Sequence, residues 1–273
     1  MLDLGRITLG LVLSTAIGGA AYWRRSLTLS GWLGAIVTGT LTFGFGGWAW
    51  GLTLITFFVS STLLSRFKAR VKEQRTGEKF AKGGQRDFGQ AMANGGIGAL
   101  LAWRMDYLVT PTVLLAAFAG VMATVTADTW ATEIGTLSRQ QPRLITTGRM
   151  VETGTSGGIT LLGTAATVGG ALLIGVVLPL FLWAEQQSTA WWVLPAALLG
   201  GVAGSLTDSL LGATVQVLYR RPDGAETERA TAQDGTPYQY ARGWRWMNND
   251  IVNLTSSLVG ALVGVAVGAV WGG

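Results

Sequence analysis

Four acidic residues lie inside or at the edge of apolar segments, where the cost of placing a charged carboxylate has to be explained. Asp128 and Glu133 end the apolar run "PTVLLAAFAGVMATVT" in the motif "ADTWATEIG", Asp208 follows "GSLT", and Asp250 begins the last apolar stretch. A charge at the centre of a bilayer costs about 2.5–3.5 kcal/mol on insertion scales, so such acids usually pair, face a cavity or bind a cation. An interhelical hydrogen bond accounts for one such acid more easily than for four together.

The chain has 273 residues and contains neither Cys nor His, which limits its chemistry. Thiolate nucleophiles, disulfides and imidazole bases are excluded, and with them most protease and redox mechanisms. Carboxylate and amide oxygens favour hard cations such as Mg²⁺. The acids therefore point to a magnesium site, accompanied by the nearby amides Asn94, Asn249 and Asn253.

Composition places these residues in a membrane protein. The sequence is 49% hydrophobic and 13% charged, has 40 Gly, and contains several apolar stretches long enough to span a bilayer. We expect an all-α polytopic protein that forms a single transmembrane domain over residues 1–273, and we interpret its first apolar run as a retained helix rather than a signal peptide. The eight expected spans are roughly 7–23, 27–44, 46–65, 88–103, 111–130, 158–184, 191–218 and 250–271.

Nearly all basic residues fall in four connections, around residues 24–25, 66–86, 139–149 and 220–245, of which the last three are longer loops. With eight spans, all four connections lie on one side, which the positive-inside rule makes cytoplasmic. Both termini then face away from the cytoplasm. We expect a bacterial inner, or thylakoid-type, membrane. Because topology explains the net charge of +5, it does not indicate nucleic-acid binding.

Two glycine-containing segments beside these acids are suited to bind anions. "GRMVETGTSGGITLLG" leads into the sixth expected span, where backbone N–H groups and the helix dipole favour a phosphate, although a turn that caps a helix is the simpler interpretation. "KFAKGGQRDFGQAMANGG" carries Lys79, Lys82 and Arg86 and leads to Asn94. Its basic residues alone are equally consistent with topology or lipid head groups. The combination with the acids favours an enzyme that handles a nucleotide and a lipid phosphate.

Five ordered motifs resemble one family. "GGQRDFGQAMANGG", "ADTWATEIG", "GTSGGITLLGT", "GSLTDSLLGATVQ" and "NNDIVN" are similar to those of the domain-of-unknown-function ninety-two family of integral membrane proteins, which includes a plant phytyl phosphate kinase. The similarity runs from about Arg66 to Asn253. The family is thought to be related to CTP-dependent phytol and dolichol kinases and to lipid cytidylyltransferases. Here "TSGG" stands where Asn-Gly-Gly is more common, and Asp250 where an apolar residue often stands.

The resemblance implies a kinase that transfers a phosphoryl group from a nucleoside triphosphate, expected to be CTP, to a phytyl- or geranylgeranyl-type monophosphate. Such a transfer needs alignment and charge neutralisation more than a strong base. We predict that Asp128, Glu133 and Asp208 are catalytic and bind Mg²⁺ together with Asp250. The predicted nucleotide and phosphate ligands are Lys82, Arg86, Asn94, Arg143, Gly154, Thr155, Ser156, Gly157, Gly158, Asn249 and Asn253.

Two alternatives come from the same features. A lipid cytidylyltransferase would use a similar site to make a CDP-lipid, and the motif spacing does not separate it from a kinase. A cation-coupled transporter would also bury acids and contain glycine-broken helices, but it requires alternating access across the bilayer. The expected position of the acids towards one face favours an enzyme.

Overall fold

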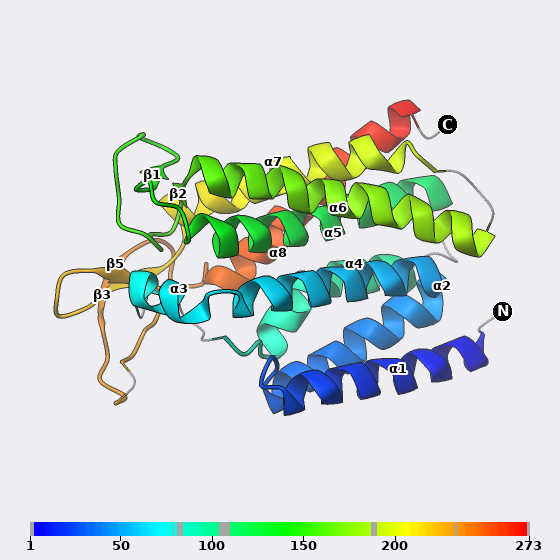
Figure 1. Ribbon diagram of the computed structural model, residues 1–273, viewed down its shortest axis with the longest axis horizontal. Coiled ribbons are helices and arrows are strands. Elements are labelled where there is room, and N and C mark those ends of the chain that lie inside the picture. Colours follow the sequence, from blue (N-terminus) through cyan, green and yellow to red (C-terminus); the bar gives the residue numbers. More distant parts are fainter. Residues whose placement is uncertain are drawn as a thin grey trace.

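A bundle of long helices with short strands and loops at one end makes up the computed structural model, which describes residues 3–77, 79–80, 84–103, 110–186, 190–232 and 234–271 (Figure 1). The helices are α1 (Leu4–Trp23), α2 (Leu29–Arg66), α3 (Ala69–Thr76), α4 (Phe88–Trp103), α5 (Pro111–Gly135), α6 (Leu161–Gln186), α7 (Val193–Thr214) and α8 (Asn249–Trp271).

Six of these helices, α1, α2, α5, α6, α7 and α8, are long and apolar enough to cross a membrane. The predicted class of all-α polytopic membrane protein is therefore confirmed. The 38-residue α2 is two helical segments, because Gly47 (φ 82°, ψ −166°) is not helical and the chain reverses there (Figure 1). Its halves correspond to the expected spans 27–44 and 46–65, and the 16-residue α4 corresponds to the fourth.

The reversal at Gly47 is stabilised by an acid from a distant helix. The carboxylate of Glu185, at the end of α6, accepts hydrogen bonds from the backbone N–H groups of Trp48 (3.0 Å) and Ala49 (2.9 Å). These N–H groups lie at the start of a helix and therefore have no acceptor within it, and the helix dipole also favours an anion there. A Cβ on Gly47 would lie 2.6 Å from Glu185 Oε1, so this turn requires glycine both for its positive φ and for space.

Helix α5 forms the centre of the bundle, and its residues 116–127 are all buried. It meets α7 and α8 at three glycines. A Cβ on Gly120 would lie 2.1 Å from the carbonyl oxygen of Gly260, and a Cβ on Gly200 would lie 2.7 Å from the same oxygen. Small residues permit this backbone contact between membrane helices, which is the packing role expected for most glycines here. On the other side of α5, Phe118 stacks on Trp50 of α2 at 3.9 Å between ring centroids.

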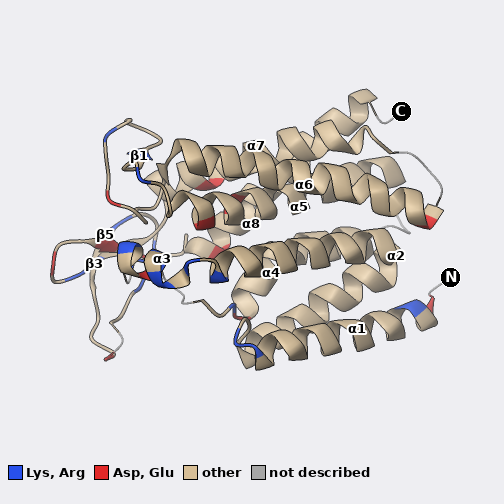
Figure 2. Ribbon diagram, viewed as in Figure 1, with Lys and Arg blue, Asp and Glu red and all other residues tan. Residues whose placement is uncertain are grey.

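Five short strands, which the sequence analysis did not predict, lie at one end of the bundle. β1 (Arg143–Leu144) pairs antiparallel with β2 (Gly158–Ile159). β3 (Leu218–Arg220) lies between β4 (Glu226–Thr227) and β5 (Gln239–Arg242), with Tyr219 opposite Thr227 and Tyr240. Helix α3 and most Lys and Arg residues share this strand end, whereas α1 begins and α8 ends at the opposite end (Figure 2).

Basic side chains at the strand end bind the last carbonyls of helices that finish there. Arg66 donates to the carbonyl of Arg24 after α1 (2.6 Å), and Lys72 donates to that of Leu64 near the end of α2 (2.6 Å). Arg75 donates to the carbonyl of Ser138 after α5 (2.8 Å). Arg242 does the same at Ala213 of α7 (3.0 Å). Cations are favoured at helix C-termini, so these residues stabilise the fold in addition to any effect on topology.

The glycine contact predicts a position-specific response to a single added methyl group. Gly120→Ala should lower the melting temperature in detergent by several degrees, because overpacking a tight contact costs about 1–3 kcal/mol and the obstacle is backbone. The control is Gly169→Ala on α6, where a Cβ meets only the side chain of Trp130 at 3.6 Å or more. Equal melting temperatures for the two variants would show that the bundle does not depend on this contact.

Candidate active site

A polar cavity of about 580 Å³ opens at the strand end and brings most of the predicted site residues together. Thirteen of the predicted residues line it, namely Arg86, Asn94, Asp128, Glu133, Gly154, Thr155, Ser156, Gly157, Gly158, Asp208, Asn249, Asp250 and Asn253. Lys82 lies outside the described residues. Arg143 is exposed on β1 and donates to the carbonyl of Gly148 within its own loop (2.9 Å), so the geometry gives no support to its prediction as a phosphate ligand.

Asp128 and Asp208 face the cavity from two neighbouring helices, α5 and α7. Ser256 of α8 donates to the carboxylate of Asp208 (3.2 Å). The two aspartates repel each other, and Glu228, which sequence reasoning missed, adds a third negative charge. Glu228 is oriented by Gln216, whose amide donates to it (2.9 Å). This concentration of negative charge around one space favours a bound cation.

Within the described residues, no three acids are close enough to hold a metal ion by themselves. Mg²⁺ does not require such a cage, because proteins commonly bind it through one or two carboxylates and complete its coordination with substrate phosphates and water. Asp128 and Asp208 therefore fit a magnesium ion that arrives with a phosphate. Asp250 lines the same cavity one turn before Asn253 on α8, and its role as a ligand stays a prediction.

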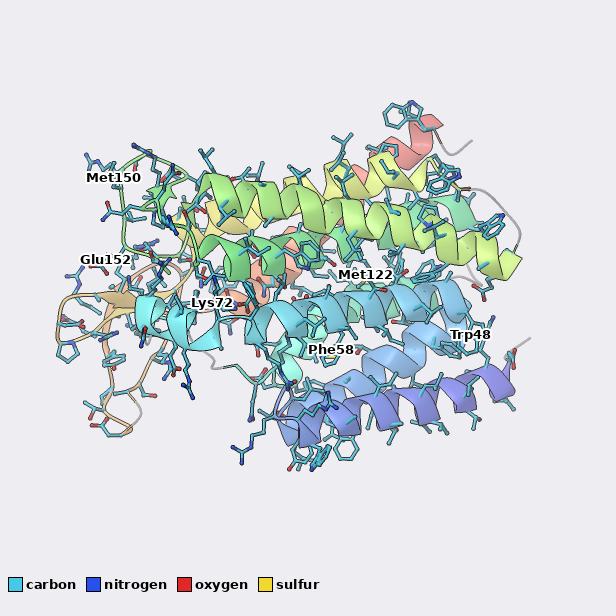
Figure 3. All side chains as sticks on the ribbon, viewed as in Figure 1. Trp48, Phe58, Lys72, Met122, Met150 and Glu152 are labelled. Carbon is cyan, nitrogen blue, oxygen red and sulfur yellow. The ribbon has the colours of Figure 1, made fainter. Side chains whose placement is uncertain are left out.

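Glu133 is held apart from the aspartates by α3. Its carboxylate forms a short ion pair with Lys72 and accepts a hydrogen bond from Ser65 Oγ at 2.5 Å. The Lys72 side chain is only 9% exposed, and it lies at the strand end (Figure 3). A metal-binding role for Glu133 stays a prediction, since this carboxylate already has a cation. Sequence reasoning placed Lys72 in a basic stretch but had no signal for this partner.

The glycine-rich turn before α6 presents unbound backbone N–H groups. Gly154 and Gly157 have positive φ (83° and 79°), and Ser156 Oγ donates to Gln216 (2.7 Å). Inside the turn, Thr155 donates to the carbonyl of Glu152 and Gly158 to that of Thr155. In the described structure the amides of Gly154, Ser156 and Gly157 donate to nothing. The adjacent free amides of Ser156 and Gly157 are of the kind that forms an anion-binding concavity in such a turn.

From the sequence, a turn that caps a helix is the simpler interpretation of this segment, and such a cap is also present. Thr160 Oγ1 accepts a hydrogen bond from the backbone N–H of Gly163 (2.9 Å), which is the geometry of a helix N-cap at the start of α6. Thr160 and Gly163 both line the cavity. The turn therefore caps α6 and faces the cavity at once, and the two interpretations do not exclude each other.

Arg86 is fixed at the cavity wall by its backbone. Its N–H donates to the carbonyl of Ser26 and its carbonyl accepts from the N–H of Thr28, both at 3.0 Å. The guanidinium donates to Thr62 Oγ1 (3.1 Å) and lies over the rings of Phe57 and Phe58, 5.9 and 5.5 Å from their centroids. Burial lowers the pKa of Arg86, opposed by the charge of Glu133, but arginine stays protonated at physiological pH.

Fold and cavity together define an integral membrane protein with a polar, charge-lined site at one end of its helix bundle. The model of the family described as integral membrane protein DUF92 matches residues 12–261, and the chain belongs to this family. This agrees with the resemblance drawn from the five motifs.

Three relatives show how far the similarity extends. Protein PGR of Arabidopsis thaliana is 33% identical over 230 residues, which are 77% of this chain and 79% of the relative. An uncharacterized membrane protein of Methanocaldococcus jannaschii is 30% identical over 243 residues, covering 89% and 86%. Protein VTE6, chloroplastic, of Arabidopsis thaliana is 26% identical over 244 residues, covering 88% and 64%. No solved structure matches this chain.

The Lys72–Glu133 pair predicts strong coupling in a double-mutant cycle. Lys72→Met leaves a largely buried carboxylate without its cation, and breaking such a pair costs about 3–5 kcal/mol. We expect each single variant, Lys72→Met or Glu133→Gln, to lower the melting temperature more than the two changes combined do.

The Lys79–Glu152 pair serves as the control for this cycle. Its atoms are 2.7 Å apart, and the Lys79 interaction lowers the pKa of Glu152, but the Glu152 side chain is 77% exposed. Exposed pairs contribute about 0–1 kcal/mol, so its coupling should be small. Strictly additive effects of Lys72→Met and Glu133→Gln would contradict a stabilising role for the buried pair.

Proposed function

We propose that the protein is a Mg²⁺-dependent kinase that transfers the γ-phosphoryl group of CTP to a phytyl- or geranylgeranyl-type monophosphate at the cytoplasmic face of a bacterial inner, or thylakoid-type, membrane. An oxygen of the lipid phosphate attacks the γ-phosphorus, the bond between the γ-phosphorus and its bridging oxygen to the β-phosphorus breaks, and CDP leaves. The products are the lipid diphosphate and CDP. The observation that carries this proposal is the cavity in which Asp128 and Asp208 lie with a turn of unbound amides.

Each part of the cavity has a role in this proposal. Asp128 and Asp208 would bind Mg²⁺, which when bound neutralises part of the triphosphate charge. The amides of the glycine-rich turn would hold phosphate oxygens, and Arg86 would bind a second phosphate from the other wall. The nucleophile is an ionised phosphate oxygen, so no side chain has to remove a proton. The absence of His is therefore no obstacle.

Family membership supports an acceptor that is a membrane lipid. The family resemblance includes a plant phytyl phosphate kinase, and the site lies at the end of membrane helices, where a lipid phosphate is found. The concentration of Lys and Arg at the strand end supports a cytoplasmic orientation of the cavity through the positive-inside rule (Figure 2).

Packing beneath the cavity favours an enzyme over a transporter. The backbone contact of Gly120, Gly200 and Gly260 lies on the three helices that carry the cavity acids. Met122 and Phe118, on the same part of α5, have no exposed surface. A transporter must open a path through this region, whereas an enzyme works with the cavity open at one end only.

A transfer assay tests the reaction directly. Purified protein in detergent is given Mg²⁺, geranylgeranyl monophosphate, and CTP labelled in parallel at the γ- or the α-phosphorus. Label that reaches the lipid from the γ position alone supports the kinase, and label from the α position shows cytidylyl transfer instead. If no label moves with CTP, UTP or ATP and several prenyl phosphates, the proposal is wrong.

Replacing one cavity aspartate should abolish turnover without unfolding the protein. Asp128→Asn removes the negative charge but keeps the size, so we expect at least a hundredfold lower kcat and a monodisperse elution profile. The matched control is Asp223→Asn, since Asp223 pairs with Arg221 within its own exposed turn and should leave activity unchanged. Loss of folding in Asp128→Asn would instead indicate that the acid serves helix packing.

A further inference from the structure

A second pocket, almost entirely apolar, adjoins the polar cavity. It has a volume of about 110 Å³ and lies between α1, both halves of α2, and α4. Its walls include Leu13, Ile17, Leu52 and Ile55. We call it the α1–α4 groove. It shares Arg86, Gln90 and Asn94 with the polar cavity, so the two spaces meet at the start of α4.

The groove extends along the helices. Its lining runs along α2 from Ala35 to Phe43 in the first half and from Trp48 to Phe58 in the second, which is roughly 12–15 Å of helix. Trp48 lies near the end of the bundle opposite to the strands (Figure 3), where its ring meets that of Phe43 at 4.7 Å. A groove about as long as one leaflet of a 30 Å hydrocarbon core matches a single lipid chain in length.

The point where the α1–α4 groove meets the polar cavity carries a positively charged side chain, that of Arg86. Among the described residues that line the groove, Arg86 alone is charged. Among the described residues its guanidinium donates one hydrogen bond, to the neutral Thr62, and has two aromatic rings beneath it, so it can bind a phosphate in addition. Gln90 and Asn94 follow at four-residue spacing on the same face of α4. An anion at this point would touch the polar cavity, while anything attached to it would enter apolar surroundings.

We propose that the α1–α4 groove binds the hydrocarbon chain of the acceptor lipid, with the lipid phosphate at Arg86, Gln90 and Asn94. This assignment rests on the proposed function in taking a lipid monophosphate as acceptor. A hydrocarbon chain with an anionic head is the occupant that the lining favours, because the apolar walls end at the charged side chain of Arg86, where the groove meets the polar cavity. The arrangement presents the phosphate to the aspartates and leaves the chain in an apolar channel.

Photo-crosslinking of the unaltered protein tests the groove without relying on turnover. The probe is a geranylgeranyl monophosphate analogue with a diazirine in the chain, added to purified protein in the absence of nucleotide. We expect label in peptides of α1, α2 and α4, and at least a tenfold reduction when unlabelled geranylgeranyl monophosphate is added. Label confined to α5–α8, or label that geranylgeraniol removes as well as the monophosphate does, would overturn the assignment.

A pair of tryptophan substitutions supplies a matched kinetic test. Ile55→Trp fills the groove, whereas Val59→Trp adds the same side chain one turn later on α2, where Val59 is 45% exposed and outside the groove. We expect Ile55→Trp to raise KM for geranylgeranyl monophosphate about tenfold. Val59→Trp should leave this KM and the kcat unchanged.

The outcomes separate the two proposals. An unchanged KM in Ile55→Trp, with the unaltered enzyme active, refutes the groove and leaves the kinase intact. If no acceptor is ever phosphorylated but the probe labels the groove in competition with the monophosphate, the kinase is refuted and the lipid-binding site stands. Should Ile55→Trp fail to fold, Ile55→Ala replaces it, and the expected effect is weaker labelling by the chain probe through lost contacts.

Discussion

The backbone contact of α5, α7 and α8 sets the geometry of the cavity. Asp128 follows Gly120 by eight residues on α5, and Asp208 follows Gly200 by eight residues on α7. Eight residues are about 12 Å of helix, so two helices that touch at these glycines bring both carboxylates to the same depth. Helix α8 runs in the opposite direction, and the hydroxyl of Ser256, on the side of Gly260 that faces the cavity, donates to Asp208. A backbone contact, supported by the hydrogen bond from Thr124 Oγ1 to the carbonyl of Gly200 (3.2 Å), thus positions the polar side chains of the cavity.

The positive charge of the Lys and Arg side chains at the strand end is balanced by helix C-termini as well as by acidic side chains. Helices α1, α2, α5 and α7 finish there with their negative dipole ends, and Arg66, Lys72, Arg75 and Arg242 bind the carbonyls involved. Much of the basic charge is therefore committed to the fold. The unbound amides of the turn before α6, at the positive end of that helix, favour anions.

Features that depend on a local sequence pattern, such as the long helices, could be predicted from the sequence. Contacts between residues far apart in the chain could not. Apolar length located the long helices that line the cavity, and the acids on those helices fall in one cavity, but it missed the polar helix α3, whose Lys72 and Thr76 line the cavity too. Hydropathy did not reveal that Glu185 caps the second half of α2, or that Lys72 reaches Glu133, because such contacts join residues far apart in the chain. Glu228 lies in a polar loop whose composition resembles any exposed loop. Motif position likewise did not reveal that the side chain of Arg143 donates to the carbonyl of Gly148 in its own loop, and its role as a phosphate ligand stays a prediction.

The junction at Arg86 gives the clearest physical reason why acids are retained at the edge of the apolar bundle. A guanidinium over two phenylalanine rings has lost much of its water, and one hydroxyl is a weak replacement. That loss is offset when an anion binds, and the anion then lies between a polar cavity and an apolar groove. Only a ligand with a charged head and a hydrocarbon chain uses both spaces at once. Under the proposed function, the aspartates act where the head of such a ligand stops, which is the strand end of the bundle rather than its middle.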